Sequence, residues 1–395
     1  MCDSTRIPVY TTFDARTNDG ARPGPAFPGP PDPWTPAPYK HMITVILAGG
    51  SGKRFWPLSR RTRPKQLIRL WDDIPMIEAT VDRLEELGSR DKTFVVLGEH
   101  LVEPTREALE DVSFIVEPAA RNTAPAIGLA AAFSLERFGD EPMAVFPADH
   151  YIGDIHKFRM CLNLARAKAE EGHIVTLGIE PTSAETGYGY IHYREPTDGR
   201  HRIAARPVLE FVEKPSRKVA EQYVESGDYA WNSGMFVFRP SVLFGEMERQ
   251  LPEMYKSMMR IRQAIGTDEE QEVIAECFAD MESISIDYGI MEGAEDVVVI
   301  PSTFSWSDVG HWAAIDEVRE TDKNGNVVDA DALLKDVSDS VIYSEGTDRL
   351  IAVCGVDGLV VVDTPDALLV VPKDRAQDVK AIVEQLEEDG RDDLL

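Results

Sequence analysis

From Met42 onward, short apolar runs alternate with amphipathic stretches, and this alternation constrains the fold more than any other feature of the chain. Met42–Ala48 is an uninterrupted apolar run, typical of a strand buried on both faces of a parallel sheet. Ile77, Val81 and Leu84 then repeat at helical spacing. Alternation of this kind predicts an α/β fold: a mostly parallel sheet covered by helices on both faces.

The same pattern continues for about 250 residues. A helix is expected over the alanine-rich segment Ala124–Phe138. Further buried strands are expected at Thr93–Leu97, Met143–Pro147, Ile174–Ile179, Val208–Val212, Met235–Phe238 and Val297–Pro301. The α/β domain is therefore predicted to span residues 42–324.

Both ends of the chain differ from this domain. Residues 1–41 are rich in Pro, Gly, Asp and Thr without periodicity, which predicts a disordered leader. Residues 325–395 predict a small β-solenoid or β-meander that ends in a helix with a stripe at Val379, Ile382, Val383 and Leu386. Its strand-like runs are Ser340–Tyr343, Arg349–Cys354, Leu359–Asp363 and Ala367–Pro372.

The charge and cysteine content exclude several classes of protein. A net charge of −28 argues against general nucleic-acid binding. The chain lacks an apolar run of membrane-spanning length, so no membrane partner is expected. The four cysteines are widely scattered. This pattern is typical of reduced thiols in a cytoplasm and not of a disulfide framework or a zinc site.

One segment opposes the acidic trend. Residues 51–70 carry basic side chains and no acidic ones. In so acidic a chain, this stretch predicts a site for a small, highly charged anion. Its basic residues are Lys53, Arg54, Arg60, Arg61, Arg63, Lys65 and Arg69.

A glycine-rich loop directly follows the first strand, where open α/β sheets bind ligands. Glycines let the backbone approach a phosphate and direct its N–H groups at it. The loop is not a P-loop, because Arg54 follows Lys53 where Ser or Thr is required. Nor is it a dinucleotide fingerprint, because Phe55 replaces the third glycine. Taken alone, the loop is weak evidence for a phosphate site, and a tight structural turn is the alternative.

The extended segment Leu47–Ser59, followed by Arg63-Pro64-Lys65-Gln66, resembles the signature of the sugar nucleotidyltransferase family. The resemblance extends over roughly residues 42–315 and implies a Rossmann-like domain followed by a small β-helix. It implies that Arg54 stabilises charge at the transferring phosphorus and that Lys65 contacts phosphate, consistent with a reaction that moves negative charge. The residues that would wrap the nucleoside triphosphate are Leu47, Ala48, Gly49, Gly50, Ser51, Gly52 and Lys53.

The segment Glu117–Ala126 resembles the guanylyltransferase version of the family's base-binding loop. The resemblance places Glu117, Asn122 and Thr123 at the nucleotide and implies GTP and mannose 1-phosphate as substrates. An ionised Glu117 would accept hydrogen bonds from the ring N1–H and the amino group of guanine. The alternative is that Glu117 only ends a strand before Pro118.

Two aspartates are the candidate metal ligands. Asp149 follows a predicted strand in Phe146–His150, which resembles the family's metal-binding segment, and Asp308 lies in Trp306–Gly310. Asp149 is also predicted to be a catalytic residue. Together they are typical of a Mg²⁺ site, since Mg²⁺ takes one or two carboxylates and completes its shell with phosphate oxygens and water. The alternatives are a helix cap for Asp149 and a turn for Asp308.

The remaining motifs resemble the family's sugar-binding segments. Glu213, Lys214 and Asn232 are expected at strand ends on the side of the glycine loop. The alternatives are a surface ion pair for Glu213 and Lys214, a turn at Asn232 and a structural role for Asp287. The candidate sugar-phosphate residues are Gly187, Glu213, Lys214, Asn232 and Asp287.

The combined motifs predict direct attack of the sugar phosphate on the α-phosphorus of GTP, without a covalent enzyme intermediate, by a homodimer. Three alternatives remain open: a nucleotidyltransferase for another base or sugar, a non-catalytic regulatory relative, and a bifunctional enzyme with an added isomerase cupin domain. No histidine follows His311, so a His-rich metal cupin is not expected.

Overall fold

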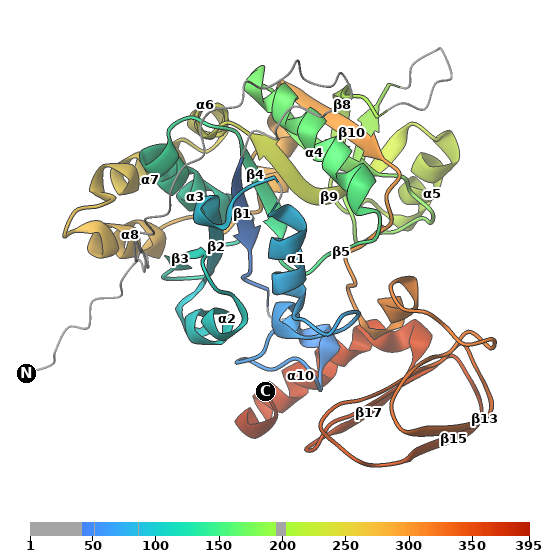
Figure 1. Ribbon diagram of the computed structural model, residues 1–395. Helices are drawn as coiled ribbons and strands as arrows, with labels where there is room; N and C mark the ends of the chain where they lie inside the picture. Colours follow the sequence, from blue (N-terminus) through green and yellow to red (C-terminus); the bar gives the residue numbers. More distant parts are fainter. Residues whose placement is uncertain (1–41, 51, 86, 195–202) are drawn as a thin grey trace, which may run out of the picture.

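The computed structural model describes residues 42–50, 52–85, 87–194 and 203–395. The expected leader, residues 1–41, lies outside the described residues. A sheet of nine strands forms the centre of the larger domain (Figure 1). Its strands are β1 (Ile43–Leu47), β2 (Thr93–Gly98), β3 (Ser113–Glu117), β4 (Met143–Pro147), β6 (Ile174–Ile179), β7 (Tyr190–Tyr193), β8 (Arg206–Val212), β9 (Tyr229–Phe238) and β10 (Val297–Ser302).

The spatial order of these strands is β3-β2-β1-β4-β9-β6-β10-β8-β7. The β1–β2, β2–β3, β1–β4 and β6–β10 pairs are parallel. Strands β8 and β9 run antiparallel to their neighbours, so the sheet is mixed, although most of its strands share one direction. A short antiparallel pair, β5 (Tyr151–Ile152) with β11 (Trp306–Ser307), lies outside this sheet.

Helices cover both faces of the sheet because alternate strand residues point to opposite sides. In β1, Ile43 and Val45 belong to one buried cluster, whereas Ile46 belongs to another. The first face is covered by α3 (Thr123–Phe138), α6 (Pro240–Gln250), α7 (Pro252–Ala264) and α8 (Glu270–Ala279). The second is covered by α1 (Met76–Leu84), α2 (Val102–Ala108), α4 (Ile155–Glu170) and α5 (Arg217–Ser226). None of the helices in the described residues combines the length and apolarity that a membrane crossing requires.

Short helical turns complete the described elements. These are α9 (Ile286–Gly289), η1 (Lys53–Phe55), η2 (Lys65–Leu67), η3 (Arg90–Lys92), η4 (Glu99–Leu101), η5 (Met291–Gly293), η6 (Trp312–Glu317), η7 (Lys373–Asp378) and η8 (Asp392–Leu394).

The expectation that Asn232 lies at a strand end is wrong. Asn232 lies within β9, where the pairing with β6 is irregular. Its side-chain oxygen accepts a hydrogen bond from Gly234 N, 3.2 Å away, and Gly234 has a φ of +69°. Asn232 and Gly234, residue types common in turns, therefore form an irregularity inside a strand.

The C-terminal domain is a β-solenoid, a coil of parallel strands, and not a meander. Strands β12 (Val327–Asp329), β14 (Val341–Ser344) and β16 (Leu359–Asp363) pair in parallel, as do β13 (Ala332–Ser338) and β15 (Ile351–Asp357). Successive strands of a meander would be antiparallel. Only β17 (Leu368–Pro372) reverses direction, against β16, and the helix α10 (Val379–Glu388) follows.

A third buried cluster joins this coil to the signature segment. Phe55 and Trp56 pack there with Val360, Val379 and Val383 of the C-terminal domain. In Figure 1, α10 crosses below the segment that follows β1. The indole N–H of Trp56 donates to the carbonyl of Leu394 at 2.9 Å, and that of Trp312 donates to the carbonyl of Trp56 at 3.0 Å. The signature segment is therefore enclosed by the C-terminal domain.

The basic stretch has a second role that its composition did not predict, besides the cations that line a cavity described below. Most of its cations face carboxylates of the C-terminal domain, so they hold the two domains together. The ion pairs are Lys53–Glu387 at 2.8 Å, Arg60–Asp366 at 3.0 Å, Arg61–Asp392 at 2.5 Å and Arg63–Glu345 at 2.6 Å.

Neighbouring residues of α10 provide a test of this packing. Val383 is 5% exposed and lies in the joining cluster, whereas Ile382, expected in the same stripe, is 39% exposed. Val383→Asp would bury an unpaired carboxylate and is expected to lower the free energy of unfolding by roughly 3 kcal/mol. Ile382→Asp is the matched control, with an expected change of about 0.5 kcal/mol or less. Urea unfolding of both variants checks this, and equal losses would contradict the packing.

Candidate active site

One cavity gathers the residues predicted to bind phosphate and metal. Its volume is about 430 Å³, and it opens where the loop after β1 meets the segments after β4 and β11. Charged side chains dominate its lining, as a phosphate site requires. It is lined by Gly52, Lys53, Arg54, Phe55, Lys65, Asp149, His150, Asp308, Gly310 and Lys380.

Gly52 determines how closely the two parts of the signature approach each other. It has a φ of +60°, and a Cβ there would lie 2.4 Å from the Cβ of Lys65. Any larger residue would combine strain with this clash. The glycine therefore lets η1, which carries Arg54, lie directly against η2, which carries Lys65.

Lys65 connects the two predicted metal ligands. Its side chain is buried, with Nζ 2.9 Å from Oδ2 of Asp149. It also donates to the carbonyls of Asp149 at 3.2 Å and Asp308 at 2.6 Å. Burial alone would raise the pKa of Asp149, but the charges of Lys65 and His150 hold it below its usual value. Asp149 is therefore ionised and ready to bind a cation.

Asp308 is held by a residue that the sequence did not single out. The hydroxyl of Tyr188 donates to Oδ1 of Asp308 at 2.7 Å. Burial raises the pKa of Tyr188, and the charge of Asp308 raises it further, so this hydroxyl remains a donor. The Tyr188 ring packs edge-on against Trp231 and Trp306. Tyr188 therefore fixes the orientation of one predicted metal ligand.

The donor set suits a cation that takes part of its shell from the substrate. Asp149 and Asp308 line the same cavity. Within the described parts of the chain, no group of three or more His, Cys, Asp or Glu side chains is arranged to hold a metal. Two carboxylates leave the remaining positions to phosphate oxygens and water, which is the usual arrangement for Mg²⁺.

The two cations of η1 differ in their surroundings. Arg54 is exposed at the cavity and takes part in none of the ion pairs formed among the described residues. Lys53, expected to bind nucleotide, lies at the same cavity but is paired with both carboxylate oxygens of Glu387. Arg54 is thus the more available cation for a bound phosphate.

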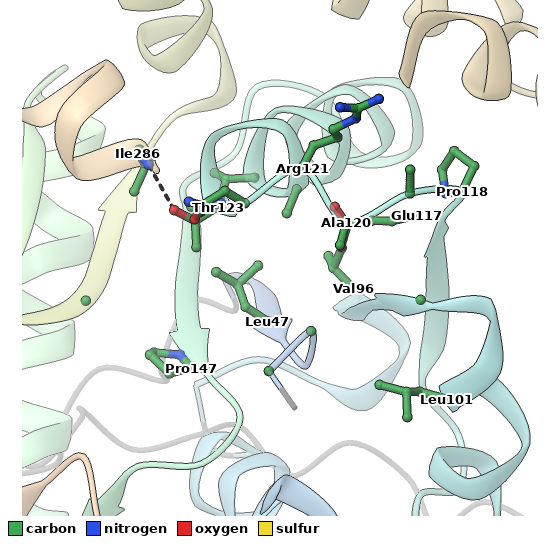
Figure 2. Close-up of a pocket in the computed structure, with 18 of the residues that line it drawn as sticks. Leu47, Val96, Leu101, Glu117, Pro118, Ala120, Arg121, Thr123, Pro147 and Ile286 are labelled. Atoms are coloured by element: carbon green, nitrogen blue, oxygen red, sulfur yellow. Dashed lines mark hydrogen bonds between the residues drawn. The ribbon is translucent and has the colours of Figure 1, made fainter. Parts of the chain in front are cut away.

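A second, larger cavity of about 860 Å³ lies on the other side of the glycine loop. Figure 2 shows the segment from Glu117 to Thr123 on one side and Leu47 and Pro147, from the ends of β1 and β4, on another. Apolar side chains such as Val96, Leu101 and Ile127 contribute to its wall. An apolar cavity with a few polar groups at its edge suits a planar ring such as a nucleobase.

Glu117 is the exceptional polar group of this cavity. Its Oε1 atom is buried and has no hydrogen-bond partner among the described residues. Burial raises its pKa to about 7. Leaving such a group unsatisfied costs free energy that a ligand with matching donors would recover. The geometry therefore favours a binding role for Glu117 over its alternative as a mere strand end.

Asn122 and Thr123, predicted to contact nucleotide, line the cavity and also shape it. The Asn122 side chain accepts from Thr123 N at 2.8 Å and caps α3. The Thr123 hydroxyl accepts from Ile286 N at 2.9 Å, as Figure 2 shows. Ala48 is buried outside both cavities, with its carbonyl accepting from Gln66, so the structure does not bring it to a ligand. Ser51 lies outside the described residues.

Four of the five predicted sugar-phosphate residues form one cluster: Glu213, Lys214, Asn232 and Asp287. Glu213 pairs with Lys214 at 2.9 Å, and the Asn232 amide donates to Asp287 at 2.9 Å. A Cβ at Gly189 would overlap Oε2 of Glu213, so Glu213 keeps its present position only beside a glycine. Burial, followed by the charge of Glu213, raises the pKa of Asp287 to about 6.

This cluster adjoins the second cavity, because Asp287 also lines it. Gly187 lies exposed before β7 with open space around its Cβ position, so nothing in its surroundings requires a glycine. Sequence reasoning missed three residues. Tyr188 directly follows Gly187 and His150 directly follows Asp149, so each is adjacent to a predicted site residue, whereas Lys380 has no local signal.

The chain resembles known proteins over most of its length. Residues 43–325 match the family described as Nucleotidyl transferase, and residues 326–386 match the MannoseP isomerase/GMP-like beta-helix domain. A mannose-1-phosphate guanylyltransferase of Klebsiella pneumoniae is 40% identical over 357 residues, which cover 89% of this chain and 75% of that protein. One of Escherichia coli K12 is 39% identical over 355 residues, which cover 88% and 74%.

A solved structure is similar over an equally large part of the chain. The protein, from Thermus thermophilus, is described as a mannose-1-phosphate geranyltransferase. It superposes with a TM-score of 0.79 at 38% identity and covers 87% of this chain and 99% of its own. The mixed sheet and the C-terminal coil are thus found together in a related protein.

The buried carboxylate of Glu117 predicts a pH-dependent stability difference. The native protein keeps this proton up to about pH 7, whereas an ordinary glutamate loses it near 4.5. Ionisation of Glu117 therefore destabilises the native state as the pH rises between these values. Glu117→Gln removes this cost and is expected to be more stable than the parent at pH 8, by on the order of 2 kcal/mol, but not at pH 4.5.

Urea unfolding at several pH values between 4.5 and 8 measures this difference. Glu99→Gln is the matched control, because Glu99 lines the same cavity but its side chain is exposed and keeps its water. A stability difference that stays constant across the pH range would show that Glu117 is not desolvated as the structure indicates.

Proposed function

Because the chain belongs to the nucleotidyl transferase family, we propose that it transfers GMP from GTP to mannose 1-phosphate, giving GDP-mannose and pyrophosphate. The observation that carries the choice of nucleotide is the buried Oε1 of Glu117, which has no partner among the described residues and lies at an apolar cavity next to a cation-lined one. In this proposal residues 42–324 form the catalytic domain, and residues 325–395 support its phosphate segment.

The nucleotide extends over both cavities. The guanine occupies the apolar cavity, and its N1–H and amino group donate to Glu117. The triphosphate crosses the glycine loop, including Gly49 and Gly50, into the cation-lined cavity. Uracil and thymine would present carbonyl oxygens beside their single N–H, and these would repel the carboxylate.

The sugar phosphate lies at the neighbouring cluster. Glu213 and Asn232 hydrogen-bond to sugar hydroxyls, and Lys214 pairs with the phosphate. Lys214 is exposed, so its ammonium can exchange Glu213 for a ligand. Asp287 contacts Asn232 and keeps its amide oriented. The cluster adjoins the nucleotide cavity, as a transfer between two bound substrates requires.

The transfer is a single displacement. A phosphate oxygen of the sugar phosphate forms a bond to the α-phosphorus while the bond from that phosphorus to the bridging oxygen breaks, and pyrophosphate leaves with the electron pair. Asp149 and Asp308 would hold a Mg²⁺ ion, which neutralises phosphate charge when bound. Arg54 and Lys65 stabilise the charge that develops on the leaving group, and the loop glycines let backbone N–H groups approach it.

We also propose that the enzyme acts as a homodimer in the cytoplasm. Association would cover large apolar side chains that the C-terminal coil exposes. These are Leu333, Leu350, Leu368 and Val370. Cys161 and Cys277 are buried free thiols, as expected in a reducing compartment.

Purified protein with Mg²⁺ is expected to release pyrophosphate from GTP and mannose 1-phosphate faster than from UTP, dTTP or ATP with the same sugar phosphate. Turnover in this nucleotide and sugar-phosphate panel is the direct test. Faster turnover with another base or sugar would overturn the proposed specificity, and no turnover with any pair would indicate a non-catalytic relative.

Three variants separate the chemistry from the fold in the same assay. Asp149→Asn and Asp308→Asn are expected to lower turnover by roughly 100-fold or more while the protein stays folded, because each removes a carboxylate from the metal site. Asp72→Asn, at an exposed position that does not line the cavity, is the control. Near-normal turnover of the first two variants would assign these aspartates structural roles.

Glu117→Gln is expected to reduce the preference for GTP by about 10- to 100-fold, the scale of one unsatisfied buried polar group. ITP lacks the amino group and should be a poorer substrate of the parent. Comparing kcat/KM for GTP, ITP and dTTP in parent and variant checks this. If the substitution slows all three nucleotides equally, Glu117 does not select guanine.

A further inference from the structure

Helix α10 of the C-terminal domain places a charged stripe beside the phosphate cavity. Lys380, Glu384 and Glu387 are spaced four and three residues apart, so they share one side of the helix. The neighbouring side carries Val379 and Val383, which are buried in the cluster that contains Phe55 and Trp56. Since that cluster lies directly under η1, the charged stripe is held next to the residues of the glycine loop.

Two contacts fix the helix in this position. Nζ of Lys53 lies 2.8 Å from both carboxylate oxygens of Glu387, which joins the last turn of α10 to η1. The indole N–H of Trp56 donates to the carbonyl of Leu394, just beyond the helix. Together with the apolar packing, these contacts leave little freedom for the first turn of α10, where Lys380 lies.

Lys380 itself lines the cation-lined cavity, together with Arg54 and Lys65. Its ion pair among the described residues is with Glu384 at 3.2 Å, and both side chains are about half exposed. Exposed pairs of this kind contribute only a few tenths of a kcal/mol, so Lys380 can leave Glu384 for a phosphate at little cost. In a chain of net charge −28, cations gathered around one cavity mark an anion site.

We propose that α10 forms part of the phosphate site and that Lys380 binds the β- and γ-phosphates of the nucleotide and the pyrophosphate that leaves. The inference rests on the proposed function for its triphosphate. It assigns the C-terminal domain a direct contact with the substrate in addition to its support of the signature segment. The ion pair between Glu387 and Lys53 holds α10 in place and so keeps Lys380 within reach of the phosphates.

The test is titration calorimetry of the full-length protein with inorganic pyrophosphate and Mg²⁺. Lys380→Gln is expected to raise the Kd of pyrophosphate about tenfold, the loss of one charge-assisted contact, and Lys380→Arg to keep it within about threefold. The matched control is Lys256→Gln, because Lys256 also pairs with a glutamate on its own helix surface, at 2.6 Å, but lies away from the cavity. Its Kd should equal that of the parent.

A kinetic measurement adds an independent readout. In the reverse reaction, Lys380→Gln should raise the KM for pyrophosphate and leave the KM for GDP-mannose unchanged. Equal pyrophosphate affinity in parent and Lys380→Gln would overturn the inference, as would equal losses in Lys380→Gln and Lys256→Gln. A parent that binds pyrophosphate but does not turn over GTP and mannose 1-phosphate would instead contradict the proposed function and leave the calorimetric result intact.

Discussion

The packing of the signature segment between the sheet and the C-terminal coil is the constraint on which the rest of the site depends. This segment contains little regular structure, with η1 and η2 each a single turn. Its shape comes from buried side chains such as Phe55, Trp56 and Trp312 and from the close approach that Gly52 permits. Because the same turns carry Arg54 and Lys65, the position of these two cations follows from the packing beneath them.

The cations of this segment divide into two groups with different roles. Arg54 and Lys65 face the cavity, whereas Arg60, Arg61 and Arg63 face carboxylates of the coil. Exposed ion pairs stabilise a protein only slightly, so the apolar cluster supplies most of the stability of the joint. The paired charges instead specify which surface of the coil meets the segment, and thereby where α10 lies relative to the glycine loop.

Two carboxylates that line the larger cavity, Glu117 and Asp287, have raised pKa values. Burial raises both pKa values, and Glu117 has a buried oxygen without a partner among the described residues. An unsatisfied buried acceptor of this kind lowers stability, and a ligand that supplies a donor recovers that free energy. Glu117 thus departs from the rule that buried polar groups are hydrogen-bonded, whereas Asp149, paired with Lys65, follows it.

The sequence by itself determined the elements that depend on short-range pattern. Apolar periodicity located β1, β4 and β6, and local motif chemistry identified Lys65, Asp149 and Asp308, which the structure brings to one cavity. Tertiary structure alone decided three other features. It placed Asn232 inside a strand, paired Lys53 with Glu387, and brought Lys380 to the cation-lined cavity. The physical reason is distance along the chain: Lys53 and Glu387 are 334 residues apart, and only the complete packing of the sheet, coil and final helix makes them neighbours.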